Sequence, residues 1–281
     1  MEFTKMHGSG NDYVYVNGSN LSLNWGEIAS SISDRHTGIG SDGLIVALPS
    51  TICDIKMRMF NADGSEGEMC GNGIRCLVSF ARSEKLVNME KSKVTVETGA
   101  GIITVTPIIE KSEMIGAKVN MGVPILDPLK IPVLLNSNSN HPILDHKLTV
   151  KDKILNLSFI SMGNPHAISF LEEDVDEFPL NELGPIVETN KIFPHKVNFE
   201  IVNIINRKKL KARVWERGSG ITMACGTGAC AIVVAARYHN IIGDDCDVVL
   251  PGGTLHIEWS GSGPVYMTGP VKTVFKGYIN Q

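Results

Sequence analysis

The chain has 281 residues, 43% apolar and 20% charged, with a formal net charge of −4 at neutral pH. This length suffices for one large domain or two smaller domains, each with its own core, and the composition is ordinary for a globular protein. The small net charge, without a basic run, gives no electrostatic reason to expect a nucleic-acid or anionic-membrane partner.

The N-terminal residues MEFTKMHGSGND contain no apolar stretch behind a basic segment, so we expect no secretory signal and a cytoplasmic protein. The longest apolar run, at 229–236, is far shorter than the ~20 residues that cross a bilayer. Six cysteines in such a chain are expected to be reduced thiols, and no C-x-x-C pair or zinc-finger His spacing indicates a metal.

Most of the elements predicted along the chain are short strands. The segment 54–60 (DIKMRMF) is typical, because its apolar and charged side chains alternate with a period of two. In chain order, we predict a helix near 24–33, strands at 44–48 and 54–60, a helix at 71–84, strands at 92–97 and 102–108, a polar loop at 136–141, an acidic helix near 172–183, strands at 198–206 and 210–215, a helix at 226–238, and strands at 255–259 and 271–279.

An internal duplication is the most informative feature. The segment 69–82 (MCGNGIRCLVSFAR) aligns with 224–237 (ACGTGACAIVVAAR), so Cys70 falls on Cys225. At nearly the same offset, Phe60-Asn61 falls on Trp215-Glu216, Gly10-Asn11 falls on Gly163-Asn164, and the turn at 99–100 falls on 252–253. Recurrence in one order at nearly one spacing indicates two similar halves.

We therefore predict an α+β fold of two pseudo-symmetric domains, each a mostly antiparallel, barrel-like sheet wrapped around a central helix. Gly122 and Pro124 interrupt the strand pattern and mark the boundary. One domain comprises 1–118 with about 268–281 and carries Cys70, and the other comprises 119–267 and carries Cys225. The last strand, at 271–279, is expected to return to the first half.

In each half a strand leads into Cys-Gly-x-Gly and then an apolar helix, which places Cys70 and Cys225 at helix N-termini. Free N–H groups and the positive end of the helix dipole favour an anion there, such as a substrate carboxylate. The same field is expected to lower a cysteine pKa from its ordinary ~8.5. If the halves face each other, one thiolate can remove an α-proton while the opposite thiol delivers one, without metal or cofactor.

Other interpretations of these residues remain. Cysteine is often a small buried apolar residue, and this is the expectation for the remaining four, Cys53, Cys76, Cys230 and Cys246. The segment 226–231 also matches the dinucleotide fingerprint G-x-G-x-x-A, with acidic residues downstream. However, the preceding strand (KARVWE) alternates polar and apolar residues, and the chain lacks the rhythm of a parallel α/β sheet.

At these residues the sequence closely resembles the diaminopimelate epimerase family over nearly its whole length. The matching segments are HGSGNDYV (7–14), RHTGIGSDGLIV (35–46), FNADGSEGEMCGNGIRC (60–76), GNPHA (163–167), VNFE (197–200) and ERGSGITMACGTGACA (216–231). The resemblance implies a cleft between two similar domains and interconversion of LL- and meso-diaminopimelate for lysine and peptidoglycan synthesis. It also implies a homodimer, for which the strand around 274–279 is a candidate contact.

The resemblance carries roles to particular residues. Cys70 and Cys225 resemble the acid/base pair, and His166 and Glu216 resemble the groups that tune them. The substrate-holding side chains would be Asn11, Asn61, Asn164, Asn198, Glu216 and Arg217, and the helix N-terminal anion sites would be Gly71-Asn72 and Gly226-Thr227. Arg suits a distal carboxylate because it offers two parallel donors. His166 could instead be a packed histidine, and Asn in Gly-Asn contexts is often a turn residue.

Two departures from the family pattern concern single positions. Gly43 stands where many relatives have Gln, so no side-chain contact can come from there. Ile221 stands where the family often has Glu, which removes one carboxylate that could tune a pKa near the second cysteine turn. Proline and hydroxyproline racemases also pair cysteines, but their small cyclic substrate has no distal carboxylate for Arg217. Phenazine-biosynthesis-like isomerases lack the pair, and a two-lobed amino-acid-binding protein would need no thiols.

Overall fold

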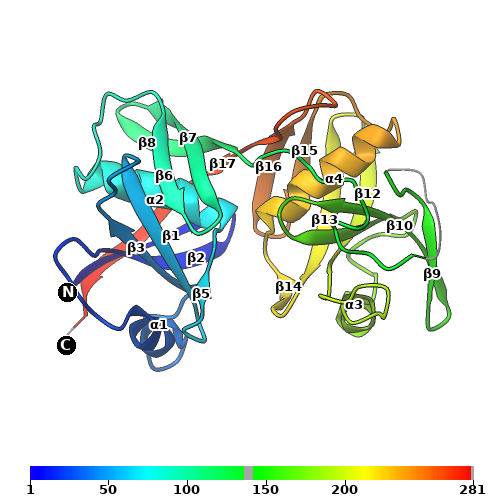
Figure 1. Ribbon diagram of the computed structural model, residues 1–281, viewed down its shortest axis with the longest axis horizontal. Helices are drawn as coiled ribbons and strands as arrows, with labels where there is room; N and C mark the ends of the chain where they lie inside the picture. Colours follow the sequence, from blue (N-terminus) through cyan, green and yellow to red (C-terminus); the bar gives the residue numbers. More distant parts are fainter. Residues whose placement is uncertain (136–141, 280–281) are drawn as a thin grey trace. The chain divides into compact units, whose positions relative to one another are not determined.

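A computed structural model describes residues 1–135 and 142–279, and the chain forms two compact units (Figure 1). Unit 1 comprises Met1–Asn120 with Thr268–Gln281, and unit 2 comprises Met121–Met267. The loop predicted at 136–141 lies outside the described residues. Within the described ranges, no helix combines the length and apolar character that a bilayer-spanning helix needs.

Unit 1 consists mainly of strands and contains the helices α1 and α2. Its elements are β1 (Glu2–Gly8), β2 (Asn11–Asn17), α1 (Trp25–Ser33), β3 (Gly43–Leu48), β4 (Ile55–Asn61), β5 (Glu66–Gly67), α2 (Gly71–Ser83), β6 (Val94–Thr98), β7 (Gly101–Glu110), β8 (Glu113–Asn120) and β18 (Lys272–Tyr278). The predicted helices at 24–33 and 71–84 are confirmed as α1 and α2.

Unit 2 repeats this composition. Its elements are β9 (His146–Val150), β10 (Lys153–Ser161), β11 (Pro165–Phe170), α3 (Leu180–Glu188), β12 (Asn198–Asn206), β13 (Lys209–Glu216), β14 (Gly220–Thr222), α4 (Gly226–Tyr238), β15 (Asp245–Leu250) and β16 (Gly253–Glu258). β17 (Tyr266–Pro270) then carries the chain from unit 2 back into unit 1.

The two units share one pattern of strand pairing. In unit 1, β2 pairs with β3 in parallel, β3 with β4 antiparallel, and β4 with β6 in parallel. In unit 2, β11–β12, β12–β13 and β13–β15 repeat these three pairings in the same order. The sequence duplication is therefore a duplication of topology, and the predicted α+β fold of two similar halves is confirmed.

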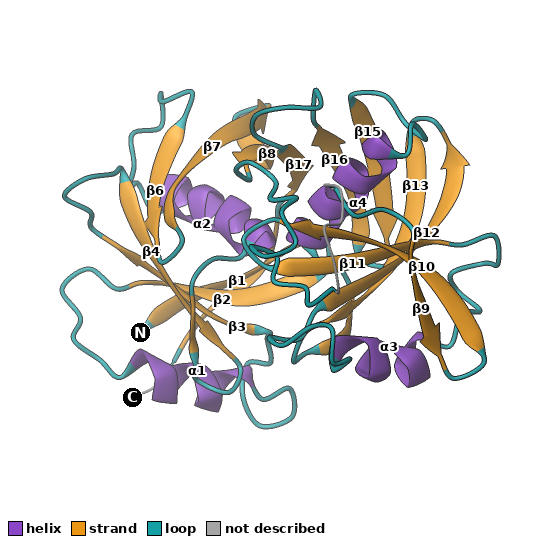
Figure 2. Cartoon of the chain, turned by 45° about the vertical axis from the view of Figure 1, so that its right-hand side comes forward, coloured by secondary structure: helices purple, strands orange, loops and turns teal. Residues whose placement is uncertain are grey.

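Alternation along the strands separates two layers of packing in each unit. On β2, Val14 and Val16 belong to the core cluster beside α1, whereas Tyr15 faces the other way and donates from Oη to the Gly73 carbonyl at 3.1 Å. On β12, Phe199 and Ile201 belong to the cluster beside α3. Each sheet thus has one of its unit's two helices on each face (Figure 2).

Helix α4 is buried almost all round. Every residue from Ala229 to Ala236 is buried, and such a helix belongs in a core rather than on a surface. Its first turn begins after Cys225, whose extended backbone (φ −114°, ψ 114°) is the usual conformation of an N-cap residue. The helix that the sequence predicts at 226–238 is confirmed with the same bounds.

The acidic helix predicted near 172–183 is wrong in position. The helix of this region, α3, begins only at Leu180, after Pro179. Before it, the Asp174 carboxylate accepts from the Asp176 N–H at 3.0 Å, which holds a local turn. Aspartate competes in this way with helical hydrogen bonding, and proline disfavours a helical conformation in the residue that precedes it.

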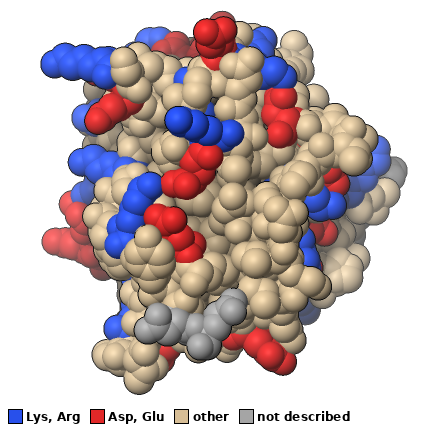
Figure 3. All heavy atoms as spheres, turned by 90° about the vertical axis from the view of Figure 1, so that its left-hand side faces the viewer, with Lys and Arg blue, Asp and Glu red and all other residues tan. Residues whose placement is uncertain are grey.

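The last strand returns to the first half, as the sequence predicts. β18 pairs antiparallel with β1, placing Glu2 opposite Tyr278 and Lys5 opposite Phe275. On the face that Figure 3 shows, basic and acidic side chains lie among each other. This face carries no broad field of one sign that would attract a polyanion.

Candidate active site

The first candidate centre is the start of α2 in unit 1. Cys70 is the N-cap, and its Sγ accepts from the Gly73 N–H at 3.3 Å. Gly71 and Asn72 form the buried first turn behind it. The sequence motif has thus placed a half-buried thiol where free backbone N–H groups point out of the helix.

Asn11 contacts this thiol and is held by an aspartate. Cys70 Sγ donates to Asn11 Oδ1 at 3.2 Å, and Asn11 Nδ2 donates to Asp42 Oδ2 at 2.6 Å. An ionised carboxylate only accepts hydrogen bonds, so Asp42 accepts from the amide nitrogen of Asn11. The amide oxygen of Asn11 is then oriented toward the sulfur. Asp42 is absent from the predicted site.

Tyr13 is a second neighbour of the Cys70 thiol, and it is absent from the predicted site. It lies on β2 between Asn11 and Tyr15, on the same face, and only 5% of its surface is exposed. Its pKa is raised well above the ordinary value, first by burial and then by the adjacent Cys70. The period of two along β2 could have indicated that these three side chains share a face.

Asn61 and Gly43 lie at the neighbouring strand ends. Asn61 closes β4, and its Nδ2 donates to Ser65 Oγ at 3.0 Å within its own turn. Gly43 lies opposite Asn61 in the sheet, and its backbone closely approaches β4. A Cβ added at Gly43 would lie only 2.1 Å from the Phe60 carbonyl oxygen. The departure at Gly43 thus coincides with a close approach of two strands.

The second candidate centre is the start of α4 in unit 2. Cys225 is the N-cap, its Sγ accepts from the Gly228 N–H at 3.4 Å, and Thr227 Oγ1 also lies 3.4 Å from the sulfur. This thiol is 5% exposed. The two helix starts therefore hold their sulfur atoms in the same way, as the aligned motifs predict.

The expectation that the helix start lowers the cysteine pKa is wrong for Cys225. Burial raises the pKa of this thiol well above its ordinary value, and the negative charges of Glu216 and Glu200 raise it further. The hydrogen bonds from Thr227 and Gly228 act in the opposite direction but are smaller influences. Local helix geometry is therefore outweighed by groups that come from β12 and β13.

A chain of polar contacts ends at this sulfur. Glu200 Oε1 lies 2.7 Å from His166 Nδ1, and His166 Nε2 lies 3.0 Å from Asn164 Oδ1. Asn164 Nδ2 in turn donates to Thr227 Oγ1 at 3.2 Å. His166 and Asn164 were predicted for the site, and Glu200 was not, although a lone acidic residue inside the apolar segment 199–202 could have indicated it.

Asn198 joins two loops of unit 2. Its Nδ2 donates to the Pro165 carbonyl at 2.9 Å, and its Oδ1 accepts from the Arg217 N–H at 2.8 Å. Arg217 itself is exposed, and its guanidinium donates to the His195 carbonyl at 3.0 Å. Asn198 therefore fixes the backbone from which Arg217 extends.

Glu216 closes β13 beside the second thiol. Burial raises the pKa of its carboxyl, whereas hydrogen bonds from Thr222 and Cys225 lower it. Thr222 Oγ1 donates to Glu216 Oε1. The preceding residue, Ile221, is 44% exposed. Glu216 is therefore one of the carboxyls that act on this sulfur, and the departure at Ile221 leaves its partner Thr222 in place.

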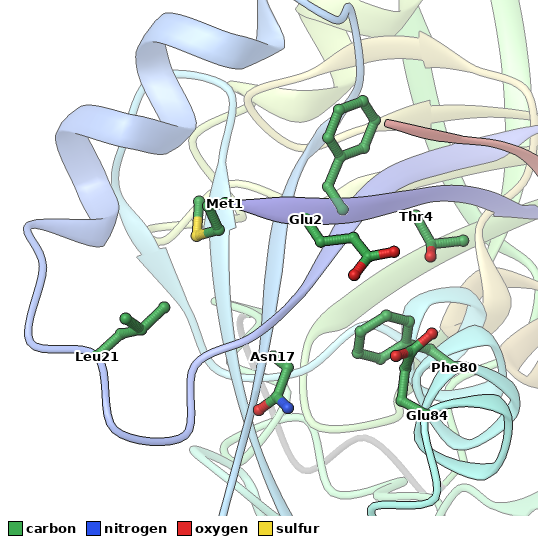
Figure 4. A pocket seen from close by; sticks show the side chains of 8 residues that line it. Met1, Glu2, Thr4, Asn17, Leu21, Phe80 and Glu84 are labelled. Carbon is green, nitrogen blue, oxygen red and sulfur yellow. The ribbon is translucent and has the colours of Figure 1, made fainter. Parts of the chain in front are cut away.

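Neither Cys76 nor Cys246 begins a helix. Burial raises the pKa of Cys76 and of Cys246 to about 11, which suits inert core thiols. A hollow of about 410 Å³ lies in unit 1. Figure 4 shows Phe80 and Glu84 of α2 facing the start of β1 across it. Its lining residues are Met1, Glu2, Phe3, Thr4, Asn17, Leu21, Phe80 and Glu84, and none of them is a predicted site residue.

Among residues 1–135 and 142–279, no group of three or more His, Cys, Asp or Glu is arranged to hold a metal ion.

Two solved structures have a fold similar to that of this chain. A phenazine-biosynthesis protein of the PhzF family from Bacillus anthracis matches with a TM-score of 0.70 and 17% identity, covering 100% of this chain and 99% of its own. A probable proline racemase from Agrobacterium radiobacter matches with a TM-score of 0.70 and 14% identity, covering 99% and 92%. The chain therefore shares its α+β fold with these proteins.

The family follows from the sequence comparisons. The family model described as diaminopimelate epimerase matches residues 3–126 and 158–274. Proteins named diaminopimelate epimerase from Methanococcus maripaludis and Desulfovibrio desulfuricans are 50% and 46% identical to the chain, covering 100% and 99% of it and 100% and 97% of their own lengths. The chain belongs to the diaminopimelate epimerase family.

Proposed function

We propose that the protein is an isomerase that interconverts LL- and meso-2,6-diaminopimelate, without metal or organic cofactor, in lysine and peptidoglycan-precursor synthesis in the cytoplasm. Cys70 and Cys225 are the acid/base pair, one thiolate removing the α-proton and the other thiol returning a proton to the opposite face. The observation that carries this proposal is the duplicated N-cap thiol, at Cys70 and Cys225, in a chain of this family.

The chemistry explains why helix starts suit this task. Removing an α-proton spreads negative charge onto the substrate carboxylate, and the backbone N–H groups behind Gly71 and Gly226 can receive that charge. Asn11 and Asn164 lie beside the two centres at corresponding positions, one in contact with Cys70 and the other with Thr227. His166 and Glu216 are the tuning groups of the second centre.

Label exchange in deuterated water tests the proposal. Enzyme treated with a chelator should convert LL-diaminopimelate toward the meso form while deuterium enters at the α-carbon, followed by proton NMR. Proline and hydroxyproline are incubated in parallel as substrates of the alternative racemase activity. Inversion of proline but not of diaminopimelate would replace the proposal by that alternative, and binding without exchange would favour a non-catalytic amino-acid-binding protein.

Arg217 is expected to hold the distal carboxylate of the substrate, with Asn61 and Asn198 completing the distal contacts. Replacing it with alanine should raise KM for diaminopimelate by about 100-fold with little change in kcat, because a charge-assisted, two-point contact outside the reacting centre is lost. Steady-state kinetics measures both constants. Arg207→Ala, in the turn between β12 and β13, is the matched control, and an unchanged KM in Arg217→Ala would remove Arg217 from the site.

We also propose that the protein is a homodimer that associates through β18. This strand pairs with β1 and exposes a row of apolar side chains, with Val274, Phe275 and Tyr278 at 52%, 44% and 76% exposure. Such an edge readily accepts a second chain. Light scattering should give twice the chain mass, and Val274→Lys should reduce it to one chain, whereas Ile204→Lys, at another exposed apolar position, should not.

A further inference from the structure

Glu200 is an acidic residue inside the buried, otherwise apolar segment 199–202 of β12. It stands on β12 between Phe199 and Ile201, which pack in the core cluster beside α3, while its own side chain points the other way toward α4. The residue is completely buried. Burial of a carboxylate is unfavourable unless partners compensate it, so a position of this kind is more often kept for function than for stability.

One oxygen of Glu200 organises the site, and the other has no hydrogen-bond partner in the described part of the chain. Oε1 meets His166 Nδ1 at 2.7 Å, and Oε2 is the atom without a partner. Because the far nitrogen of His166 meets the oxygen of Asn164, that amide turns its nitrogen to Thr227 Oγ1. The hydroxyl of Thr227, 3.4 Å from Cys225 Sγ, is then available to the sulfur.

Glu200 also lies directly behind the second thiol, across Gly228. A Cβ added to Gly228 would be 2.8 Å from Glu200 Oε1 and 3.3 Å from Cys225 Sγ, so carboxylate and sulfur are separated by no more than the sum of these distances. Glu216 from β13 is the other carboxylate acting on Cys225, and His166 from β11 faces both carboxylates. Burial raises the pKa of the Glu200 carboxyl, whereas His166 acts in the opposite direction and favours its charged form. At the first centre, Asp42 is partly exposed and acts on the amide of Asn11, which in turn accepts from Cys70 Sγ.

We propose that Glu200 is a positioning residue: it holds His166 and Asn164 against the start of α4, and its charge keeps Cys225 in the protonated thiol form. Resting on the proposed function, this makes Cys225 the proton donor of the resting enzyme and Cys70 the base. The Cys70 thiolate takes the α-proton and leaves an electron pair on the α-carbon. The Cys225 S–H bond then breaks, its proton bonds to that pair, and the sulfur keeps the S–H electrons as a thiolate.

Two substitutions separate the charge of Glu200 from its geometry. Glu200→Gln keeps the shape and the acceptor for His166 but removes the charge, so the thiolate of Cys225 should form at lower pH. Alkylation of Cys225 by iodoacetamide, followed against pH by mass spectrometry of its peptide, should shift by about one pH unit, while alkylation of Cys70 in the same samples stays unchanged. The alkaline limb of the pH–rate profile should shift in the same direction.

Glu200→Asp keeps the negative charge but shortens the side chain by one methylene group, so the carboxylate lies farther from His166. The pH midpoint of Cys225 alkylation should stay where it is in the unaltered protein, while kcat falls at least about tenfold with little change in KM. Asp247→Asn, which removes the carboxylate of the half-exposed pair that His256 Nδ1 and Asp247 Oδ1 form at 2.8 Å, is the control and should change neither readout.

The outcomes are distinct. An unchanged Cys225 midpoint in Glu200→Gln, or an equal shift in Glu200→Asp, overturns the inference, and so does a loss of thermal stability as the only effect of both variants. If the Gln variant does not fold, the Asp variant decides alone, through its kcat and its midpoint. Alkylation is measured without substrate, so a shifted midpoint in a protein that does not epimerise diaminopimelate would refute the proposed function and leave the role of Glu200 standing.

Discussion

Cys70→Ala and Cys225→Ala should each reduce epimerisation of diaminopimelate by about 10³-fold, because each variant lacks the proton donor or acceptor for one face of the α-carbon. Thermal unfolding should remain cooperative, since each side chain caps its helix through one backbone N–H and the loss of such a cap costs about 1 kcal/mol. Conversion is measured by chiral separation of the two stereoisomers. Full activity in either variant would refute the two-thiol assignment.

The single variants should also show partial chemistry. With one thiol left, the enzyme can remove and return the α-proton on one face, so deuterium should enter one stereoisomer without inversion. The opposite variant should exchange the other stereoisomer. Cys53→Ala is the matched control, because Cys53 is a free, partly exposed thiol outside both helix starts, and it should epimerise normally.

Gly228→Ala should lower kcat by about 100-fold. The added methyl would lie 2.8 Å from Glu200 Oε1 and 3.2 Å from the Cys225 Cβ, so the carboxylate or the thiol must move. A displacement of about 1 Å at a reacting group costs on the order of 10²-fold in rate. Since alanine is otherwise the better helix former, a loss of activity without a loss of helicity would identify the contact as the cause.

The duplicated motif provides the matched control for this substitution. A methyl at the equivalent position, Gly73, would meet Ile45 Cδ1 at 2.6 Å, which is the end of a flexible side chain that can turn away. Gly73→Ala should therefore retain more activity than Gly228→Ala, by about tenfold. Equal losses in the two variants would show that the tight space at both helix starts, rather than Glu200, limits the reaction.

Local sequence signals predicted the parts of the site that depend on neighbouring residues. Cys-Gly-x-Gly after an alternating strand placed Cys70 and Cys225 at the first residue before α2 and α4, because strand, turn and helix follow each other directly. The alignment of the two halves also indicated the shared topology. The prediction at 172–183 failed because the acidic pattern was read as helical, whereas Asp174 stabilises a turn and Pro179 delays the helix.

The missed residues depend on pairing between distant segments. Glu200 reaches His166 because β11 and β12 are parallel neighbours, with Ile168 opposite Glu200, and nothing in either segment alone specifies that register. Asp42 reaches Asn11 through the equivalent pairing of β2 and β3. The pKa of Cys225 was predicted in the wrong direction for the same reason: the helix field is local, but the burial and the carboxylates come from the whole unit.

The pairing of β18 with β1 bears on how the chain folds during its synthesis. Unit 2 is one continuous stretch, Met121–Met267, and can fold as soon as that stretch has left the ribosome. Strand β18 of unit 1 is translated only after unit 2. Until then, the first 120 residues lack the strand that pairs with β1. The half that is made first is thus the last to be completed.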